Sequence, residues 1–223
     1  MGRLLLVRHG QASFGADDYD VLSDAGRDQA RRLGAHLAAL DVVPDVLLHG
    51  ELRRQRDTAT EMAGAAGWRL APRLDARWDE LDHLAVLGAY GDPDHQALDR
   101  RAFQEAFERA TGRWAGGGAP DAPIEGLESY AGFVARVRAG LDEAAHQAGP
   151  GATVVAVSSG GAIAAAAALL LGATGPDLAA AWSRLNAVLV NSSYSTVVVG
   201  STGARLLTYN EHPHVTGPSL TYR

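Results

Sequence analysis

The sequence contains no cysteine and no lysine. Without cysteine the chain has no disulfide, no zinc–thiolate site and no thiol nucleophile, and its composition is compatible with a reducing compartment. Without lysine, Walker-A nucleotide binding and Schiff-base chemistry are excluded. Arginine supplies the permanent positive charges, and we interpret this, together with the heavy use of alanine, as a composition bias of the encoding genome.

Long hydrophobic runs and a basic charge balance are also missing. No run approaches the roughly 20 apolar residues of a membrane span, and the first apolar stretch is too short for a signal peptide and is interrupted by Arg8. We therefore expect a cytoplasmic protein that does not bind membranes. The formal net charge of −6 argues against a nucleic-acid partner, because binding a polyanion needs a basic face. A single anionic group could still be bound locally.

The first apolar run leads directly into Arg8-His9-Gly10. Residues 4–7 are typical of a strand buried on both faces, as in a parallel sheet. In open α/β sheets, ligands bind beyond the carboxyl ends of the strands. Arginine can donate two hydrogen bonds to a phosphate, imidazole can act as nucleophile or base, and glycine lets the backbone approach a ligand. Taken alone, the pattern fits an ordinary polar turn equally well.

Strands and helices alternate along the chain. Strands are expected at residues 4–7, 46–48 and 153–157, with a further candidate at 68–70 that Pro72 keeps from being a central strand. Helices are expected from Ser23 or Asp24 to Leu40 and at residues 51–66, 129–147 and 162–171, with an amphipathic helix or helix pair at 93–114. The segments 188–190, 194–199 and 204–208 are β-rich, and the turn at 200–203 indicates an antiparallel hairpin.

This order of elements predicts an α/β protein of three layers, α/β/α, with a mixed, mostly parallel sheet and a C-terminal antiparallel hairpin. The 223 residues, 47% hydrophobic and 21% charged, fit one globular domain over residues 1–223. Residues 11–22 look like a loop. We expect residues 88–123 to be a lid-like insertion, because the middle region has too few apolar residues for a core of its own.

Two further segments offer groups for chemistry. Residues 78–83 combine acidic, aromatic and imidazole side chains and make Glu80 a candidate general acid, although most charged clusters are solvated loops. Ser158-Ser159-Gly160-Gly161 joins a buried strand to an apolar helix. Backbone N–H groups at such a helix start can bind a phosphate, and a plain tight connection has the same pattern.

Several spaced motifs resemble those of one family. Arg8-His9-Gly10 follows the first strand as the family's signature tripeptide does. Leu22-Ser23, Gly26 and Gln29-Ala30 resemble its "LT..G..QA" segment, Leu52, Arg54, Thr58 and Ala59 resemble its "S.L.RA..TA" helix start, and Glu80 falls within its "L.E.D". The chain therefore resembles the histidine phosphatase superfamily, the phosphoglycerate mutase-like proteins, over nearly its whole length.

The resemblance implies a phosphoryl-transfer enzyme that needs no cofactor and no metal. It implies that His9 is the nucleophile that accepts the phosphoryl group, that Arg8 and Arg54 stabilise the charge on the phosphoryl oxygens, and that Glu80 is the general acid. Phosphate contacts are expected from Arg8, Gly10, Arg54, Ser159 and Gly160. The partner is then a small phosphorylated substrate or inorganic phosphate.

Two departures from the family's pattern bear on activity. The family has a second histidine in "SHGG", where this chain has Ser159, and it has Ser-Ser where this chain has His49-Gly50. A hydroxyl can donate a hydrogen bond to a phosphoryl oxygen, but it cannot carry the charge of an imidazolium. Losing one such donor costs about 10² to 10³ in rate.

Another histidine could replace the missing imidazole. His49, His83, His212 and His214 are the candidates. The strand at 204–209 returns from the hairpin and should end at the same sheet edge as the first strand, so His212 is our hypothesis, against the alternative of a capping or surface residue. His214-Val215 resembles the family's closing "ND..HL". A metal site at His212 and His214 is disfavoured because only Glu211 is a nearby carboxylate.

We therefore expect a phosphomonoester hydrolase that acts through a phosphohistidine on His9. The alternative is a catalytically impaired relative that binds a phosphorylated ligand without turning it over. A phosphoglycerate mutase is a weaker alternative, because a mutase must protect its phosphohistidine from water and Ser159 gives no reason to expect that.

Overall fold

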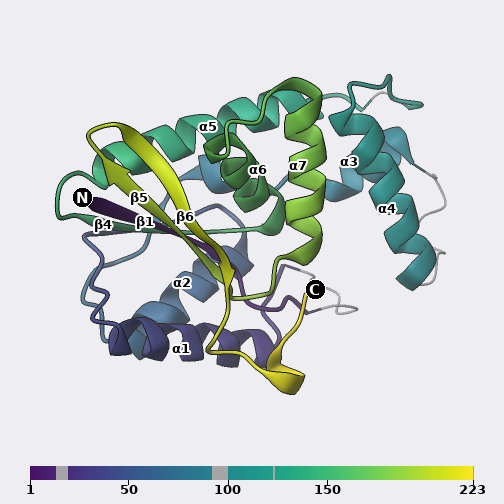
Figure 1. Ribbon diagram of the computed structural model, residues 1–223. Coiled ribbons are helices and arrows are strands. Elements are labelled where there is room, and N and C mark those ends of the chain that lie inside the picture. Colours follow the sequence, from purple (N-terminus) through teal and green to yellow (C-terminus); the bar gives the residue numbers. More distant parts are fainter. Residues whose placement is uncertain (14–19, 92–99, 123, 223) are drawn as a thin grey trace.

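The computed structural model describes residues 1–13, 20–91, 100–122 and 124–222. Within these residues, six strands form one sheet in the order β3-β2-β4-β1-β5-β6 (Figure 1). The strands are β1 (Gly2–Arg8), β2 (Val46–His49), β3 (Arg73–Leu74), β4 (Thr153–Ser158), β5 (Tyr194–Gly200) and β6 (Gly203–Glu211).

The strand directions confirm the expected mixed sheet. β3, β2, β4 and β1 are parallel to their neighbours, whereas β5 is antiparallel to β1 and pairs with β6 as an antiparallel hairpin. Since β6 reverses the direction of β5, it runs parallel to β1. The carboxyl ends of β1, β2, β4 and β6 therefore lie along one edge of the sheet.

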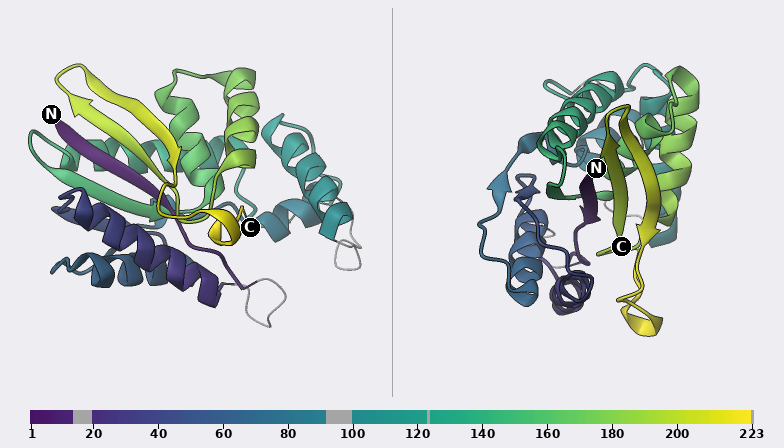
Figure 2. Two further views of the ribbon diagram at one scale, coloured as in Figure 1. Left: turned by 60° about the horizontal axis from the view of Figure 1, so that its bottom comes forward. Right: turned by 60° about the vertical axis from the view of Figure 1, so that its left-hand side comes forward.

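Helices cover both faces of the sheet, which confirms the three-layer fold. α1 (Asp24–Ala39) and α2 (Arg53–Ala66) lie on one face, and α5 (Tyr130–Gln147), α6 (Gly160–Leu170) and α7 (Gly175–Val188) lie on the other, as Figures 1 and 2 show. α3 (His83–Tyr90) and α4 (Arg100–Ala115) lie beside α7, away from the strands (Figure 1). The 3-10 helices η1 (Ala76–Trp78) and η3 (Gly217–Ser219) are in connecting segments.

Alternating side chains of β1 explain why its apolar run is uninterrupted. Leu4 and Leu6 belong to the core beneath α5–α7, whereas Leu5 and Val7 belong to the core beneath α1 and α2. Each of these side chains is at most 3% exposed. A strand covered on both faces has no side for polar residues, so the charged residues of β1, Arg3 and Arg8, lie on either side of the apolar run at 4–7.

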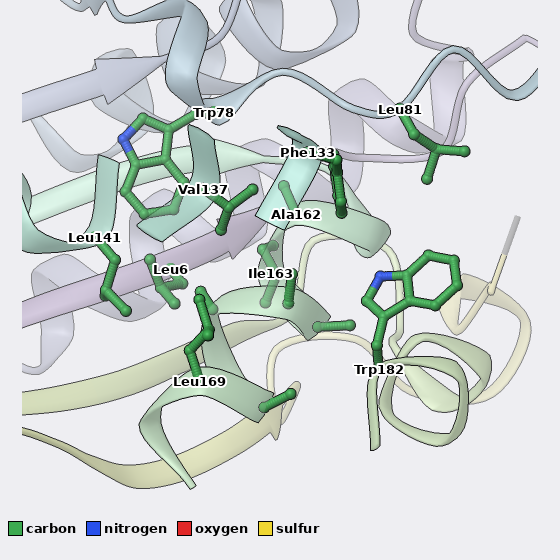
Figure 3. Packing of buried hydrophobic residues seen from close by; sticks show 14 of the residues in the cluster. Leu6, Trp78, Leu81, Phe133, Val137, Leu141, Ala162, Ile163, Leu169 and Trp182 are labelled. Carbon is green, nitrogen blue, oxygen red and sulfur yellow. The ribbon is translucent and has the colours of Figure 1, made fainter. Parts of the chain in front are cut away.

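The larger core joins segments that are distant in the sequence (Figure 3). Trp182 of α7 packs near Phe133 of α5 and Trp114 of α4, with ring centroids 6.5 and 6.0 Å apart. Trp78 of η1 is also fully buried. This packing holds the segment that leads to Glu80 against α5 and the sheet.

The helix ends follow the expected capping chemistry. Ser23 accepts a hydrogen bond from the Gly26 N–H, and Ser129 accepts one from the Gly132 N–H. Gly67 ends α2 in the left-handed conformation, with φ of 70°, which glycine adopts without steric cost. α2 and α6 begin at Arg53 and Gly160, within two residues of the predicted starts.

The predicted strand at residues 68–70 is wrong. The Trp68 N–H bonds the Ala63 carbonyl and the Trp68 indole donates to the Val42 carbonyl, so the chain folds back over the end of α2. The third strand starts only at Arg73, beyond Pro72. Trp68 and Leu70 are partly buried against the core beneath α1 and α2 but do not belong to the sheet.

The predicted β structure at residues 188–190 is also wrong. Val188 ends α7, which the sequence patterns did not predict, and Leu189 and Val190 pair with no strand among the described residues. Their backbone groups bond side chains instead: the Leu189 carbonyl accepts from Arg8 and the Val190 N–H donates to Asn210. α3 was likewise not predicted.

Parts of three predicted segments lie outside the described residues. They are positions 14–19 of the loop at 11–22, positions 92–99 of the helical region and of the lid-like insertion, and position 123. Within the described part, the helical region contains α4 at Arg100–Ala115.

Candidate active site

His9 lies one residue beyond β1, at the carboxyl edge of the sheet, and is 5% exposed. Its backbone is fixed on both sides: the His9 N–H donates to the Ser158 carbonyl at 2.9 Å, and its carbonyl accepts from the Ser192 N–H at 3.1 Å. The ring Nδ1 lies 2.7 Å from the Gly10 carbonyl oxygen, and the Arg54 Nε–H donates to His9 Nε2 at 3.2 Å. The ring is therefore held at both nitrogens.

These partners determine the protonation state of His9. A guanidinium can only donate and a carbonyl can only accept, so Nδ1 carries the proton and Nε2 presents a lone pair. Burial, and then the positive charges of Arg54 and Arg8, hold the pKa of His9 well below its ordinary value. The neutral imidazole with an unprotonated Nε2 is the form that can act as a nucleophile.

Arg54 is placed by the first turn of α2. It is 6% exposed, and its Nη1 forms a 2.8 Å ion pair with Asp20. Asp20 also accepts from the Arg53 N–H at 2.7 Å, so it caps α2, whose N-cap residue Leu52 has no side-chain hydrogen bond. The loop carboxylate thus fixes both the helix start and the guanidinium.

Arg8 approaches His9 from the end of β1. One of its Nη atoms donates to the Leu189 carbonyl, and a Cβ built on Gly160 would lie 3.7 Å from Arg8 Nε. The Arg8 guanidinium therefore lies beside the first residue of α6. Arg8 and Arg54 bring positive charge to His9 from two different elements.

Gly10 needs to be glycine for steric reasons. A Cβ at this position would overlap the backbone of Gly26 in α1. The Gly10 N–H donates to Thr58 Oγ1 at 3.0 Å, and the Thr58 hydroxyl donates to the Arg54 carbonyl at 2.7 Å. Thr58 thus ties the loop after His9 to the helix that carries Arg54.

Glu80 reaches the same edge from the segment after η1. Its carboxylate accepts from the Gly161 N–H at 2.8 Å and from the Leu81 N–H at 3.0 Å. It therefore caps the amino end of α6, where backbone N–H groups and the helix dipole favour a negative charge. This places Glu80 next to the turn that contains Ser159 and Gly160.

Ser159 is 1% exposed and is the N-cap residue of α6, but its side chain does not cap the helix. Its Oγ instead accepts from Gln55 Nε2 at 2.8 Å. Gln55 did not emerge as a site residue from the sequence, although the family's "S.L.RA..TA" pattern has alanine at that position. A glutamine in place of alanine beside Arg54 was the available signal.

The other candidate histidines have different surroundings. His212 Nδ1 lies 2.5 Å from the Asn210 carbonyl, and His49 Nδ1 lies 2.7 Å from the Gly50 carbonyl. His214 Nε2 contacts Ser192 Oγ at 3.4 Å. His83 begins α3, and burial together with the charge of Arg54 lowers its pKa. No hydrogen bond within the described residues joins these four rings to His9.

Within residues 1–13, 20–91, 100–122 and 124–222, no group of three or more histidine, aspartate or glutamate side chains could hold a metal ion. Over the same stretches, none of the helices has the length and apolar character that crossing a membrane requires. His9, Arg8, Arg54, Glu80 and Ser159 meet at one edge of the sheet. A buried neutral imidazole flanked by two guanidiniums is suited to attack an anionic, electrophilic group such as a phosphoryl.

The chain is similar to known proteins over most of its length. The sequence model of the histidine phosphatase superfamily (branch 1) matches residues 4–212. A mycobacterial glucosyl-3-phosphoglycerate phosphatase in complex with inorganic phosphate is 26% identical, covers 97% of this chain and 100% of its own, and superposes with a TM-score of 0.66. The same enzyme with VO3 is 28% identical over 94% of this chain and 99% of its own, with a TM-score of 0.64.

A curated relative matches a shorter segment. The 2,3-bisphosphoglycerate-dependent phosphoglycerate mutase of Leifsonia xyli subsp. xyli is 34% identical over 115 residues, which are 45% of this chain and 46% of the mutase. The chain thus spans about half the length of the curated relatives that it matches.

Proposed function

Since this chain belongs to the histidine phosphatase superfamily, whose sequence model spans residues 4–212, we propose that it is a phosphomonoester hydrolase acting through a phosphohistidine on His9. One observation carries the proposal: His9 Nε2 presents a lone pair to a buried site in which Arg54 Nε lies 3.2 Å away. The ring cannot turn this lone pair away without breaking the Nδ1–H bond to Gly10.

In the first step, His9 Nε2 attacks phosphorus as the ester P–O bond breaks. The leaving alkoxide takes a proton from the Glu80 carboxyl group. Arg8 and Arg54 stabilise the charge on the equatorial oxygens, and they are held in position before the reaction by Leu189 and Asp20. Ser159 and the Gly160 N–H at the start of α6 supply further donors, and Gly10, whose N–H bonds Thr58, lets the loop after His9 pass close to α1.

In the second step, water attacks the phosphohistidine. Glu80, now a carboxylate, takes a proton from the water, the P–N bond breaks, and the electron pair returns to Nε2. Inorganic phosphate leaves and the neutral ring is restored. No step needs a metal or a cofactor. Because serine stands where the family has a second histidine, we expect turnover about 10² to 10³ below that of a complete site.

We also propose a role for His212, which lies one residue beyond β6. β6 runs parallel to β1, so its end approaches the edge that holds His9. The Asn210 carbonyl accepts from Nδ1, leaving Nε2 of His212 available to a ligand. His212 would then supply the imidazole that Ser159 lacks.

The partner that we propose is a small phosphorylated substrate, bound by a single domain in which the described parts of the insertion, residues 88–91 and 100–122, belong to the lid. The net charge of −6 supports a small anion held locally rather than a nucleic acid. We place the reaction in the cytoplasm.

A second candidate function is a protein that binds a phosphorylated ligand without turnover, and only Ser159 favours it. A mutase is the weaker alternative, since the enzyme that aligns with this chain over nearly its whole length in two solved structures is a phosphatase.

A panel of phosphomonoesters tests the proposal. His9→Ala should abolish hydrolysis, a loss of at least about 10³. In the first step, measured as the rate of phosphorylation of His9 in a single turnover, Glu80→Gln should slow alkyl phosphates by about 10² and p-nitrophenyl phosphate only slightly, because an activated leaving group needs no general acid. Glu51→Gln, an exposed glutamate, is the matched control. An equal loss of rate with both classes of ester would show that Glu80 is not the general acid. If the His212→Ala variant turned over at the wild-type rate, His212 would not supply the missing imidazole.

A further inference from the structure

Three residues that depart from the family's pattern meet at one place. Gln55 stands where "S.L.RA..TA" has alanine, Gly50 stands where it has serine, and Ser159 replaces the histidine of "SHGG". Gln55 is 0% exposed and donates to Ser159 Oγ at 2.8 Å. A Cβ on Gly50 would overlap Gln55 Oε1. The absence of a side chain at Gly50 and the short side chain at 159 make room for the glutamine.

The orientation of the Gln55 amide is determined by Trp78. The Trp78 carbonyl can only accept, and Gln55 Nε2 donates to it at 3.2 Å. The same nitrogen therefore faces Ser159 and gives it the second amide hydrogen. A flipped amide would put two carbonyl oxygens face to face, so the donor role of Gln55 toward Ser159 is unambiguous.

The Ser159 hydroxyl is left with a hydrogen to donate. A hydroxyl has one donor hydrogen and two acceptor lone pairs, and Gln55 occupies one lone pair. The Trp78 carbonyl already accepts from Gln55 and, at 2.6 Å, from the Ser158 hydroxyl. The Gly161 N–H at the start of α6 donates its hydrogen bond to Glu80 and not to Ser159. Among the described residues, no hydrogen-bond acceptor takes the Ser159 hydroxyl hydrogen.

This hydroxyl lies among the groups of the candidate site. Ser159 follows Ser158, which pairs with Arg8 across β4 and β1, and precedes Gly160, which lies beside the Arg8 guanidinium. Gln55 follows Arg54, whose Nε bonds His9. The Gln55–Ser159 bond therefore spans the carboxyl end of β4, between the two arginine-bearing elements.

We propose that Gln55 is a positioning residue that holds the Ser159 hydroxyl as a hydrogen-bond donor to a phosphoryl oxygen. It occupies one oxygen lone pair and so turns the hydroxyl hydrogen away from the protein. This inference rests on the proposed function for the identity of the bound group. It also explains the serine: the site keeps one preorganised donor where an imidazole is lost.

The same geometry makes the glutamine and an imidazole mutually exclusive. Gln55 Nε2 lies at hydrogen-bond distance from the Oγ of residue 159, so a ring built there would overlap the amide. Ser159→His alone should therefore lower the melting temperature. Ser159→His combined with Gln55→Ala should recover that loss, and turnover should exceed that of either single variant.

A double-mutant cycle tests the positioning role directly. Gln55→Met keeps the length of the side chain and removes both polar atoms, and Ser159→Ala removes the hydroxyl. We expect Gln55→Met to lower kcat about tenfold when residue 159 is serine and to change it less than twofold when residue 159 is alanine. Gln147→Met is the matched control, because Gln147 also has a buried Oε1 without a partner but lies at the end of α5, near the amino end of β1.

The outcomes separate positioning from packing. Equal losses in the serine and alanine backgrounds, or no loss in either, overturn the inference. If Gln55→Met does not fold, Gln55→Ala serves in its place, since α2 favours alanine. The affinity for inorganic phosphate, measured by calorimetry on the same four proteins, should show the same coupling.

The phosphate measurement distinguishes this inference from the proposed function. A wild-type protein that binds phosphate with the Gln55–Ser159 coupling but hydrolyses no ester contradicts the hydrolase and supports the positioning role. A protein that hydrolyses esters without the coupling supports the hydrolase and contradicts the positioning role. A protein that does not bind phosphate contradicts both.

Discussion

At the residue scale, burial lowers the pKa of three imidazoles, those of His9, His83 and His214, and so makes the folded state less stable in acid. Desolvation is the main cause of the lowered pKa of His9 and lowers the pKa of His214 to about 4. His214 packs on His36 and Tyr194, with ring centroids 5.7 and 6.4 Å apart, and its buried Nδ1 has no hydrogen-bond partner within the described chain. Protonating either ring in the folded state places a charge in a buried or partly buried position.

His214 therefore predicts how stability depends on pH. Its folded pKa lies below the unfolded value of 6.5, so the unfolded chain binds the proton first as pH falls. Stability that is fully present above about pH 6.5 is lost toward pH 4, by at most about 3 kcal/mol from this group. His214→Gln should show a flatter pH dependence in urea unfolding between pH 7.5 and pH 4.5. Identical slopes in the two proteins would contradict this assignment.

At the element scale, the start of α2 depends on a residue from another segment. Leu52 cannot cap the helix, and Asp20 supplies the missing acceptor to the Arg53 N–H while pairing with Arg54. A helix start with no local cap would leave donors unsatisfied next to a buried guanidinium. The loop at 20–22 is thus part of the support of the site.

Asp20→Ala should lower the free energy of unfolding by about 1 to 2 kcal/mol, because it removes a cap and uncovers the Arg54 charge. Asp28→Ala is the control: Asp28 pairs with Arg32 on the exposed surface of α1, where such pairs contribute at most about 1 kcal/mol. Chemical denaturation of the three proteins gives the comparison. A loss for Asp20→Ala no larger than that for Asp28→Ala would show that the cap is not structural.

The elements that could be predicted from the sequence are those with a strong local pattern. β1 and β4 are continuous apolar runs, and α1 and α5 have serine caps before helical stripes. α7 was missed because it begins with Gly175-Pro176 and because Val188 to Val190 resemble a strand. Leu189 and Val190 are buried, but the side chains of Arg8 and Asn210 bond their backbone groups, and side chains from distant positions leave no local signal.

The same distinction applies to the candidate site. Spaced motifs in the sequence predict four of the site residues, Arg8, His9, Arg54 and Glu80. The structure brings these four residues to one edge of the sheet. Asp20 and Gln55 could not be assigned from spacing, since their roles depend on contacts with Arg54 and with Ser159, which lies more than 100 positions away from Gln55. The bond is visible only when β4 and α2 are placed side by side.

At the scale of the whole molecule, the sheet assembles the site. β1 and β4 are adjacent and parallel, so Arg8 pairs with Ser158, and His9 and Ser159 follow at the same edge. α2 and α6 then point their amino ends at this edge from opposite faces of the sheet (Figure 1). Positive helix ends and two arginines converge there, which is an arrangement suited to a doubly charged phosphoryl group.

The central claim is that His9 Nε2 carries the phosphoryl group during turnover, and a trapped intermediate tests it most directly. The protein is mixed with a substrate labelled in the phosphoryl group, quenched in alkaline denaturant within milliseconds to seconds, and digested for mass spectrometry. We predict one phosphorylated histidine, His9, whose label is acid-labile, decays in water and is absent in His9→Ala. Turnover of the substrate without any label on His9 at any quench time, or with a label on another residue, would contradict the mechanism.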